Sequence, residues 1–235
     1  MEFSVVICTW KRHEEINKAI SYYQLFSDDI VVWDNGNVSD YIENKQEILV
    51  IKPSLNLGSC AKFKATAFTR NNYVLISDDD VIPEEGFAED LCFTLSSFDT
   101  PYLNLLAIFG RRFPEGGGYN HDENQRFRAR DIKELTPVDF LGQLYFGHRN
   151  FFTVDIQNTK SVYDDVMLIH LQNVVHKDLK RWVLPTKHYH YSSDMIGKHE
   201  LCNQPEFYDK RDKLSKAIYA RDIDVMNRVL HGGDV

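Results

Sequence analysis

The fold is decided by the stretch Tyr73-Val74-Leu75-Ile76-Ser77-Asp78-Asp79-Asp80, in which an apolar run leads directly into three consecutive aspartates. A short β-branched run of this kind predicts a buried strand over 73–77. Three adjacent carboxylates repel one another, so a nearby cation is needed to stabilise them. In an open α/β sheet, ligands bind outside the carboxyl ends of the strands, where the strand order reverses. The stretch therefore predicts a cation-dependent ligand site at the end of a strand.

Strands and helices alternate on both sides of this stretch. Apolar residues in 13–26 have the spacing of one helix face, whereas the compact β-branched run in 3–9 is typical of a buried strand. Alternation at these intervals favours a doubly wound α/β half with a parallel sheet. The sequence predicts strands over 3–9, 30–33, 48–51, 73–77 and 102–109, and helices over 13–26, 60–69 and 91–98.

The character of the sequence changes after about residue 110. Residues 112–131 are polar, contain three consecutive glycines and show no periodicity, which is typical of a functional lid. The remainder predicts strand-like segments over 138–146 and 150–154, then helices over 164–176 and 206–230. We expect a single domain over 1–235, with a nucleotide-binding half over 1–110 and a smaller half for a second substrate over 111–235.

Composition narrows the functional classes. The chain has 235 residues, 43% of them hydrophobic, and a formal net charge of −8 from 27 Lys+Arg and 35 Asp+Glu. An acidic chain without a basic stripe is not expected to bind nucleic acid. Its apolar runs are too short for a membrane span. Four widely spaced cysteines, with no signal peptide before the first strand, predict a cytoplasmic protein.

The aspartates themselves predict a metal site. Alternation along an extended segment would place Asp78 and Asp80 on the same side. Two carboxylates suit Mg²⁺ or Mn²⁺, which take oxygen ligands and share them with a diphosphate. The alternative is a solvated acidic turn that caps the helix following Pro83-Glu84-Glu85.

Four stretches in order resemble the GT-A glycosyltransferases, nucleotide-sugar enzymes with a DxD motif. The resemblance is strong over roughly residues 3–90 and implies a Rossmann-like doubly wound α/β sheet, a UDP-sugar donor and a Mn²⁺ or Mg²⁺ cofactor. The stretches are Ser4-Val5-Val6-Ile7-Cys8-Thr9-Trp10-Lys11-Arg12, Val31-Val32-Trp33-Asp34-Asn35-Gly36, Asn56-Leu57-Gly58-Ser59-Cys60-Ala61-Lys62 and Val74-Leu75-Ile76-Ser77-Asp78-Asp79-Asp80.

The resemblance also implies roles for individual residues. Thr9 and Arg12 would border the nucleobase, and Asp34 would accept a hydrogen bond from uracil N3–H, although an Asx turn at Asp34-Asn35-Gly36 is an equal reading. Lys62 would lie near the base or the phosphates. Nucleotide-sugar contacts would come from Asp78 and Asp79, and metal ligands would be Asp78, Asp80 and a histidine.

The second half offers an acceptor site by the same resemblance. Asp164-Asp165 matches the acidic pair that opens a helix in the family's acceptor region, so Asp165 is the candidate general base and Asp164 would bind hydroxyl groups. The alternative is a helix start whose acids favour the helix dipole. We choose His190 as the third metal ligand, with His188 as the second choice, because Tyr191-Ser192-Ser193 begins a polar segment that could close the site.

Two features leave the stereochemistry of transfer open. Phe146-Gly147-His148-Arg149 and Val138-Asp139-Phe140 resemble exostosin-like retaining members of the fold, in which Asp139 or Arg149 would assist the donor. The Gly-Gly or Gly-Ala pair that usually precedes the acidic pair in inverting family-2 enzymes is missing here.

The predicted function is transfer of a hexose-type sugar from a UDP-sugar to a glycan or other hydroxyl acceptor. The first alternative is a haloacid-dehalogenase-type phosphohydrolase, whose nucleophilic aspartate ends the first strand and whose second acid is followed two residues later by Thr or Val. Here the acidic triplet ends a fourth strand, and Ile82 occupies that position. A sugar-1-phosphate nucleotidyltransferase would need a glycine-rich loop after the first strand, and Thr9-Trp10-Lys11-Arg12-His13 has no glycine. The non-enzymatic alternative is a nucleotide-sugar-binding module.

Overall fold

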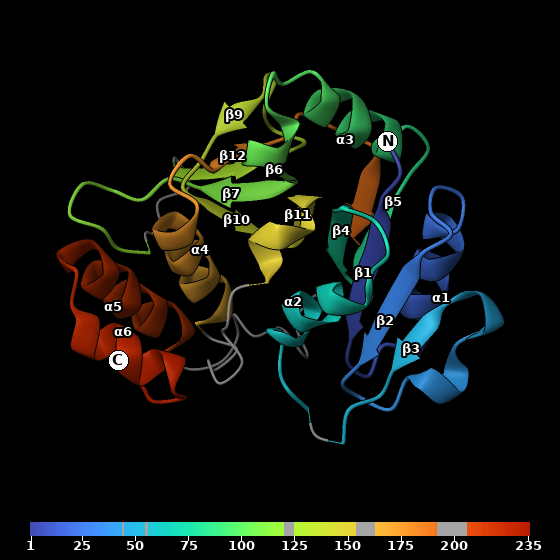
Figure 1. Cartoon of the computed structure of the whole chain (residues 1–235), viewed down its shortest axis with the longest axis horizontal. Coiled ribbons are helices and arrows are strands. Elements are labelled where there is room, and N and C mark those ends of the chain that lie inside the picture. The colour runs from blue at the N-terminus through green and yellow to red at the C-terminus, as the bar shows by residue number, and fades with distance from the viewer. Residues whose placement is uncertain (44, 55, 120–124, 154–162, 192–205) are drawn as a thin grey trace.

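The first half of the chain forms four parallel strands in the order β3-β2-β1-β4. The structure, a computed structural model, describes residues 1–43, 45–54, 56–119, 125–153, 163–191 and 206–235. The strands are β1 (Ser4–Thr9), β2 (Ile30–Asp34), β3 (Leu49–Ile51) and β4 (Tyr73–Asp78), and Figure 1 shows them side by side. The strand order reverses at β1, which pairs with β2 on one side and β4 on the other.

The same sheet continues into the second half, where its strands are mixed in direction. The full order is β3-β2-β1-β4-β11-β6-β12-β9, with β11 antiparallel to both neighbours. The added strands are β6 (Asn104–Ala107), β9 (Thr136–Pro137), β11 (Leu144–His148) and β12 (Lys180–Val183). One eight-stranded sheet thus links the first half of the chain to the rest.

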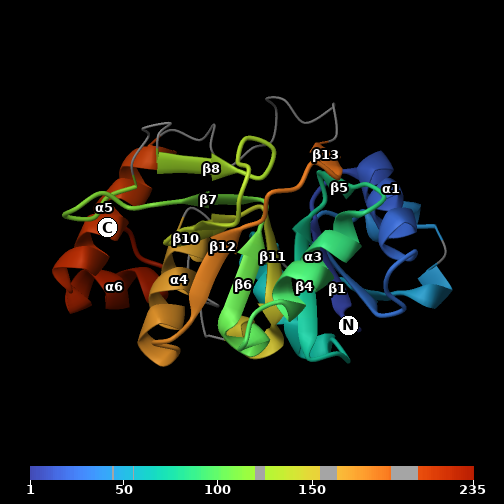
Figure 2. The ribbon, with the colours of Figure 1, turned by 90° about the horizontal axis from the view of Figure 1, so that it is seen from above.

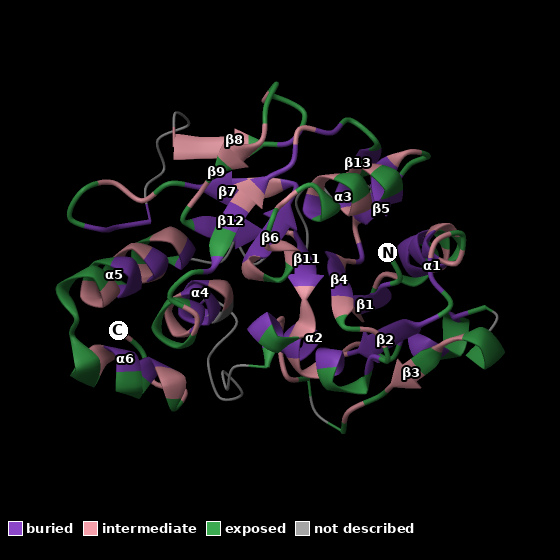
Figure 3. Cartoon of the chain, turned by 45° about the horizontal axis from the view of Figure 1, so that its top comes forward, coloured by how far each residue is buried: buried purple, intermediate pink, exposed green. Residues whose placement is uncertain are grey.

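Helices cover both faces of this sheet, because alternate strand residues point to opposite sides. One core joins Val6, Val31 and Val74 to α2 (Ala61–Ala65), α4 (Asp164–Val175) and α5 (Phe207–Ala220). The other joins Val5, Val32 and Leu75 to α1 (His13–Tyr23) and α3 (Phe87–Ser96). The central strands are buried on both sides, as Figure 3 shows. This α/β/α layering is the predicted doubly wound class.

Two small sheets complete the fold. β5 (Val81–Pro83) pairs with β13 (Tyr189–Tyr191), and Figure 2 shows this pair beyond one end of β1 and β4. β7 (Phe109–Arg111) lies between β10 (Phe140–Gly142) and β8 (Arg126–Arg128). The chain ends with α6 (Ile223–Leu230) packed against α5.

Several details differ from the sequence prediction, including the helix predicted over 206–230, which is two helices, α5 and α6. Arg149–Phe152 is a 3₁₀ helix rather than a strand. The 112–131 segment contains β8, so it is not a plain loop. The segment 138–146 is two strands that turn at Gln143, whose φ is +68°. The sequence did not predict β12, because this strand has only four residues and two of them, Lys180 and Arg181, are charged.

Along the part of the chain that the structure describes, no helix combines the length and the apolar character needed to cross a bilayer.

Candidate functional site

The carboxyl ends of β1, β2 and β4 bring the predicted donor residues to one edge of the sheet. Thr9 is in register with Asp34 of β2, and its neighbour Cys8 is in register with Asp78 of β4. Because parallel strands end at the same edge, residues 9, 34 and 78 meet although they are far apart in sequence. We call Thr9, Arg12, Asp34, Lys62 and Asp78–Asp80 the strand-end site.

Asp79 is the buried centre of the acidic triplet. Its side chain is only 6% exposed and forms an ion pair with the Arg12 guanidinium. The backbone N–H of Trp10 donates to Asp79 Oδ2 at 3.3 Å. Burial raises the pKa of Asp79 to about 6, against the lowering effect of Arg12 and Thr9. Asp79 therefore ties the turn after β1 to the turn after β4.

Asp80 lies in the same turn and is less well compensated. β4 ends at Asp78, so residues 79 and 80 form a turn and the expected strand alternation does not apply to them. The Arg12 guanidinium is 3.6 Å from Asp80 Oδ2. Burial, followed by the negative charge of Asp78, raises the pKa of Asp80 to about 7. Crowded carboxylates with too little positive charge are the donor set that a hard divalent cation stabilises.

Lys62 reaches the triplet from α2. Its Nζ is 3.0 Å from Asp78 Oδ1, and its side chain is 7% exposed. The ammonium group also lies 5.3 Å from the centre of the Tyr145 ring. The structure therefore brings Lys62 to the acidic edge, where it forms an ion pair with Asp78.

Asp34 shapes the turn that follows β2. Asp34 is 1% exposed. Its side-chain oxygens accept hydrogen bonds from the backbone N–H groups of Gly36 and Val38 at 2.9 Å and of Ser39 at 2.7 Å. Burial opposes ionisation, but these donors outweigh it and lower the pKa of Asp34. This is the Asx-type turn that the sequence allowed; the contact with uracil stays a prediction.

Gly36 explains how this turn packs against the end of β1. A Cβ atom at residue 36 would lie 2.6 Å from the Lys11 nitrogen and 2.8 Å from the Trp10 ring. The glycine thus permits the Asp34 turn and the Trp10 turn to touch. Trp10 is 38% exposed beside this contact. Sequence analysis missed it, although an exposed aromatic residue at a strand end was a usable signal.

Tyr191 and Gln143 were also missed, and both border the triplet. The backbone N–H of Asp78 donates to the Gln143 carbonyl at 3.1 Å, and the Tyr191 hydroxyl donates to Gln143 Oε1. Burial is the main cause that raises the pKa of Tyr191, and the charges of Asp80 and Asp78 contribute. Gln143 accepts these contacts from a left-handed backbone conformation, which is strained for a residue with a side chain.

The two candidate histidines lie on β13 and the segment before it, but the structure does not join them to the aspartates. His190 Nδ1 is 2.8 Å from Glu84 Oε1, and His188 Nε2 is 3.9 Å from Asp90 Oδ2. Within the described ranges, no group of three or more His, Cys, Asp or Glu residues is arranged to hold a metal ion. The predicted set of Asp78, Asp80 and His190 is therefore not assembled here.

Asp165 forms a buried ion pair rather than pointing alone into a cleft. Arg211 of α5 binds both of its oxygens, with Nη2–Oδ1 at 2.6 Å and Nη1–Oδ2 at 3.0 Å. The two side chains are 14% and 5% exposed. Asp164 begins α4, and its side chain lies outside what the structure describes.

The exostosin-like candidates are separated from the strand-end site. Arg149 follows His148, which is in register with Tyr73 at the opposite end of β4 from Asp78. Its guanidinium donates to the Thr69 carbonyl at 3.0 Å. Asp139 Oδ2 accepts from the Phe113 N–H at 2.9 Å and lines a different cavity. Neither geometry supports the expected assistance to a donor at the strand-end site.

Solved structures with the same architecture are sugar-transfer proteins. TarS 1-349 of S. aureus, solved with UDP-GlcNAc, has a TM-score of 0.56 and 18% identity over 85% of this chain and 60% of that one. GalNAc-T7, solved with UDP, GalNAc and Mn²⁺, has a TM-score of 0.55 and 14% identity over 79% and 42%. The fold is that of the GT-A glycosyltransferases.

A third solved structure is matched over a larger share of its own length. Glucosyl-3-phosphoglycerate synthase of Mycobacterium tuberculosis, solved with Mg²⁺ and UDP, has a TM-score of 0.57 and 12% identity over 89% of this chain and 76% of that one. By contrast, the chain spans only about 40 to 60% of the length of GalNAc-T7 and TarS 1-349. No family model matches the sequence, and no curated protein does. At these identities, the likeness establishes the fold.

Proposed function

We propose that this chain is a metal-dependent glycosyltransferase that moves a hexose-type sugar from a UDP-sugar to a hydroxyl of a glycan or glycoconjugate. The observation that carries the proposal is the acidic triplet Asp78-Asp79-Asp80, located at the strand-order reversal of a GT-A fold. The proposal is further supported by the neighbouring structures, since GalNAc-T7 was solved with UDP and Mn²⁺ and glucosyl-3-phosphoglycerate synthase with UDP and Mg²⁺.

The residues of the strand-end site would divide the work of holding the donor. Asp78 and Asp80 are the ligands that would hold Mn²⁺ or Mg²⁺, which takes one or two carboxylates and shares the phosphates of its substrate. When bound, the ion would neutralise charge that develops on the departing diphosphate. Arg12 holds Asp79 in place, so the turn keeps its shape when the donor enters.

Lys62 and the Asp34 turn supply the remaining donor contacts in this proposal. Lys62 Nζ lies 3.0 Å from Asp78 Oδ1, so its ammonium group would stand beside the donor phosphates when Asp78 holds the metal. Thr9 and the Asp34 turn border the nucleobase from the ends of β1 and β2, with Trp10 exposed beside them. A planar base can pack against an exposed ring of this kind.

Asp165 is the proposed base, and Asp164 the proposed acceptor contact, on the basis of their place at the start of α4. Arg211 binds both oxygens of the Asp165 carboxylate and holds it in one orientation at the start of α4. The same ion pair gives Asp165 a structural role. A test of Asp165 must therefore measure stability beside turnover.

Calorimetric titration with UDP tests the proposal directly. We expect UDP to bind in the presence of Mn²⁺, weakly or not at all with EDTA, and GDP to bind more weakly than UDP. UDP release from a panel of UDP-sugars then tests catalysis. Absence of Mn²⁺-dependent UDP binding would remove the proposal. Binding without release from any UDP-sugar would instead favour a nucleotide-sugar-binding module.

A further inference from the structure

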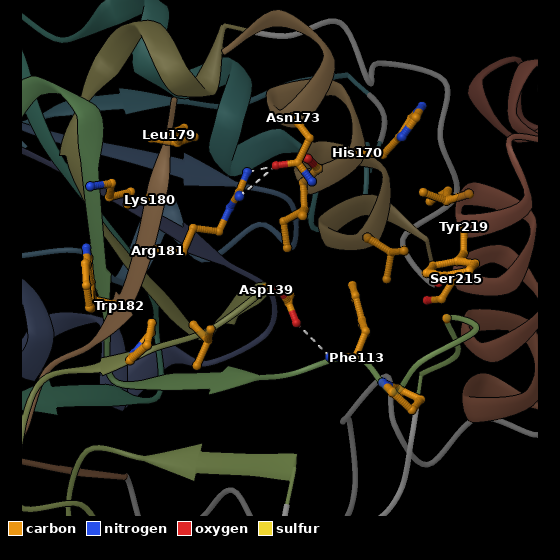
Figure 4. A pocket seen from close by; sticks show the side chains of 17 residues that line it. Phe113, Asp139, His170, Asn173, Leu179, Lys180, Arg181, Trp182, Ser215 and Tyr219 are labelled. Atoms are coloured by element: carbon orange, nitrogen blue, oxygen red, sulfur yellow. Dashed lines mark hydrogen bonds between the residues drawn. The ribbon is translucent and has the colours of Figure 1, made fainter. Parts of the chain in front are cut away.

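A cavity lies on the face of the sheet that α4 and α5 cover, away from the strand-end site. Its volume is about 590 Å³, within the range of small-molecule sites. Its walls come from the start of β12, residues 137–139, one side of α4, the second half of α5 and residues 113–117. Figure 4 shows these elements around the opening. No residue of the strand-end site lines it.

Arg181 is the buried charged group in the wall of this cavity. The residue is 6% exposed and extends from β12 toward α4, as Figure 4 shows. Its Nη1 donates to Asn173 Oδ1 at 2.8 Å, and its Nη2 donates to Gln172 Oε1 at 2.9 Å and weakly to the Ile169 carbonyl at 3.5 Å. All three acceptors are neutral.

These contacts leave the guanidinium group under-compensated. It has five N–H donors, of which at most three are used, and Nε has no hydrogen-bond partner among the described residues. No carboxylate of the described chain lies within ion-pair distance of it. Burial lowers the pKa of Arg181 to about 10, partly offset by the charge of Asp139, so the group remains charged at neutral pH. Buried charges in proteins are normally paired.

We propose that this cavity is a binding site for a small organic anion, whose carboxylate or phosphate group takes the place of the missing counter-charge of Arg181. The volume is far larger than a bare oxyanion needs, so the ligand also has an apolar body. The walls that would contact this body are Phe113, Pro114, Val138, Val166, Ile169 and Ile218.

The other ionisable groups of the wall agree with an anionic ligand. Asp139 is exposed to solvent and already accepts from the Phe113 N–H, so water screens its repulsion. Burial lowers the pKa of His170, which keeps that ring neutral at pH 7. Lys180 adds a positive charge at the rim. The balance is one net positive charge, located mainly on the buried guanidinium.

Two probes that share a planar ring test the site: phenyl phosphate and benzoate, with benzyl alcohol as the neutral control. Binding is measured by calorimetry on the full chain without nucleotide, and the Arg Nε–H signals are followed by ¹H–¹⁵N correlation spectra. We expect at least one anion to bind and to shift the Arg181 signal. R181Q should weaken that binding at least about tenfold, because it removes a hydrogen bond between charged groups. K213Q, which removes an exposed cation of α5 outside the cavity, should change it less than about twofold.

The preferred anion identifies which oxyanion the site takes. Equal affinity for benzyl alcohol, no saturable binding up to about 10 mM, or binding that R181Q leaves unchanged would each overturn the proposal. If R181Q does not fold, I218W keeps Arg181 and fills the cavity, and it should abolish the signal shift. Because the experiment uses no nucleotide, its failure leaves the glycosyltransferase proposal untouched, and the reverse also holds.

Discussion

The strand-end site and the cavity beside α4 and α5 have opposite charge imbalances. In the first, three neighbouring aspartates face two cations, Arg12 and Lys62. In the second, buried Arg181 donates to amide and carbonyl oxygens, and no carboxylate of the described residues lies within ion-pair distance of it. Each imbalance predicts a ligand of the complementary sign. Asp165 and Arg211 form a third case in the same protein, a buried ion pair in which the two charges balance each other.

The largest expected effect is on the acidic side of this comparison. Asp80→Asn removes one of the two proposed metal ligands, so UDP binding in Mn²⁺ should fall to the level measured with EDTA. Glu85→Gln, which removes an exposed carboxylate five residues later, is the matched control and should bind UDP normally. Titrations with UDP at fixed Mn²⁺ measure both. Retained metal-dependent binding in Asp80→Asn would show that the imbalance has another purpose.

Substitution of Asp165 in the ion pair with Arg211 should lower the free energy of unfolding. Asp165→Ala leaves Arg211 buried without its carboxylate, which costs about 3–5 kcal/mol of unfolding free energy. Asp209→Asn changes an exposed carboxylate on the same helix as Arg211 and should cost little. Urea unfolding measures the difference.

Turnover separates the structural role of Asp165 from the proposed chemical one. Measured well below the unfolding temperature, Asp165→Asn should lower turnover at least about 100-fold with UDP affinity intact, the lower limit for loss of a general base. Turnover that survives in a folded Asp165→Asn would leave only the ion pair with Arg211.

The comparison also explains what could be read from the sequence. β1, β2 and β4 and the residues Thr9, Asp34 and Asp78 were predictable, because strand-end residues of parallel neighbours meet by topology. The Arg211 contact with Asp165 joins residues 46 positions apart through helix packing, which no local pattern encodes. Neither did the sequence indicate that His190 would contact Glu84, since strand alternation predicts a side but not a partner.

A smaller, pH-dependent effect is expected at Asp34. Its pKa is lower in the folded chain than in the unfolded one, so its contribution to stability is present above about pH 4 and is lost as the pH falls through the folded pKa. Asp34→Asn turns an N–H group toward backbone donors and should cost about 1–3 kcal/mol at pH 7. The difference from wild type should shrink at pH 3. Asp40→Asn, an exposed neighbour, should show no such difference in urea unfolding; equal behaviour of the two variants would contradict the role of the turn.

The smallest effect distinguishes the two side chains of β13 at the acidic edge. Tyr191 donates to Gln143, which also accepts from the Asp78 backbone, whereas His190 is bound to Glu84. Tyr191→Phe removes one hydrogen bond and should weaken Mn²⁺-dependent UDP binding about 2- to 10-fold. His190→Gln keeps a polar side chain opposite Glu84 and should change that binding less than about twofold. If His190→Gln instead shows the larger loss, the imidazole must leave Glu84 when donor and metal bind. The acidic edge would then recruit its third ligand only on binding, and the charge imbalance seen at Asp78 and Asp80 would be the driving force for that rearrangement.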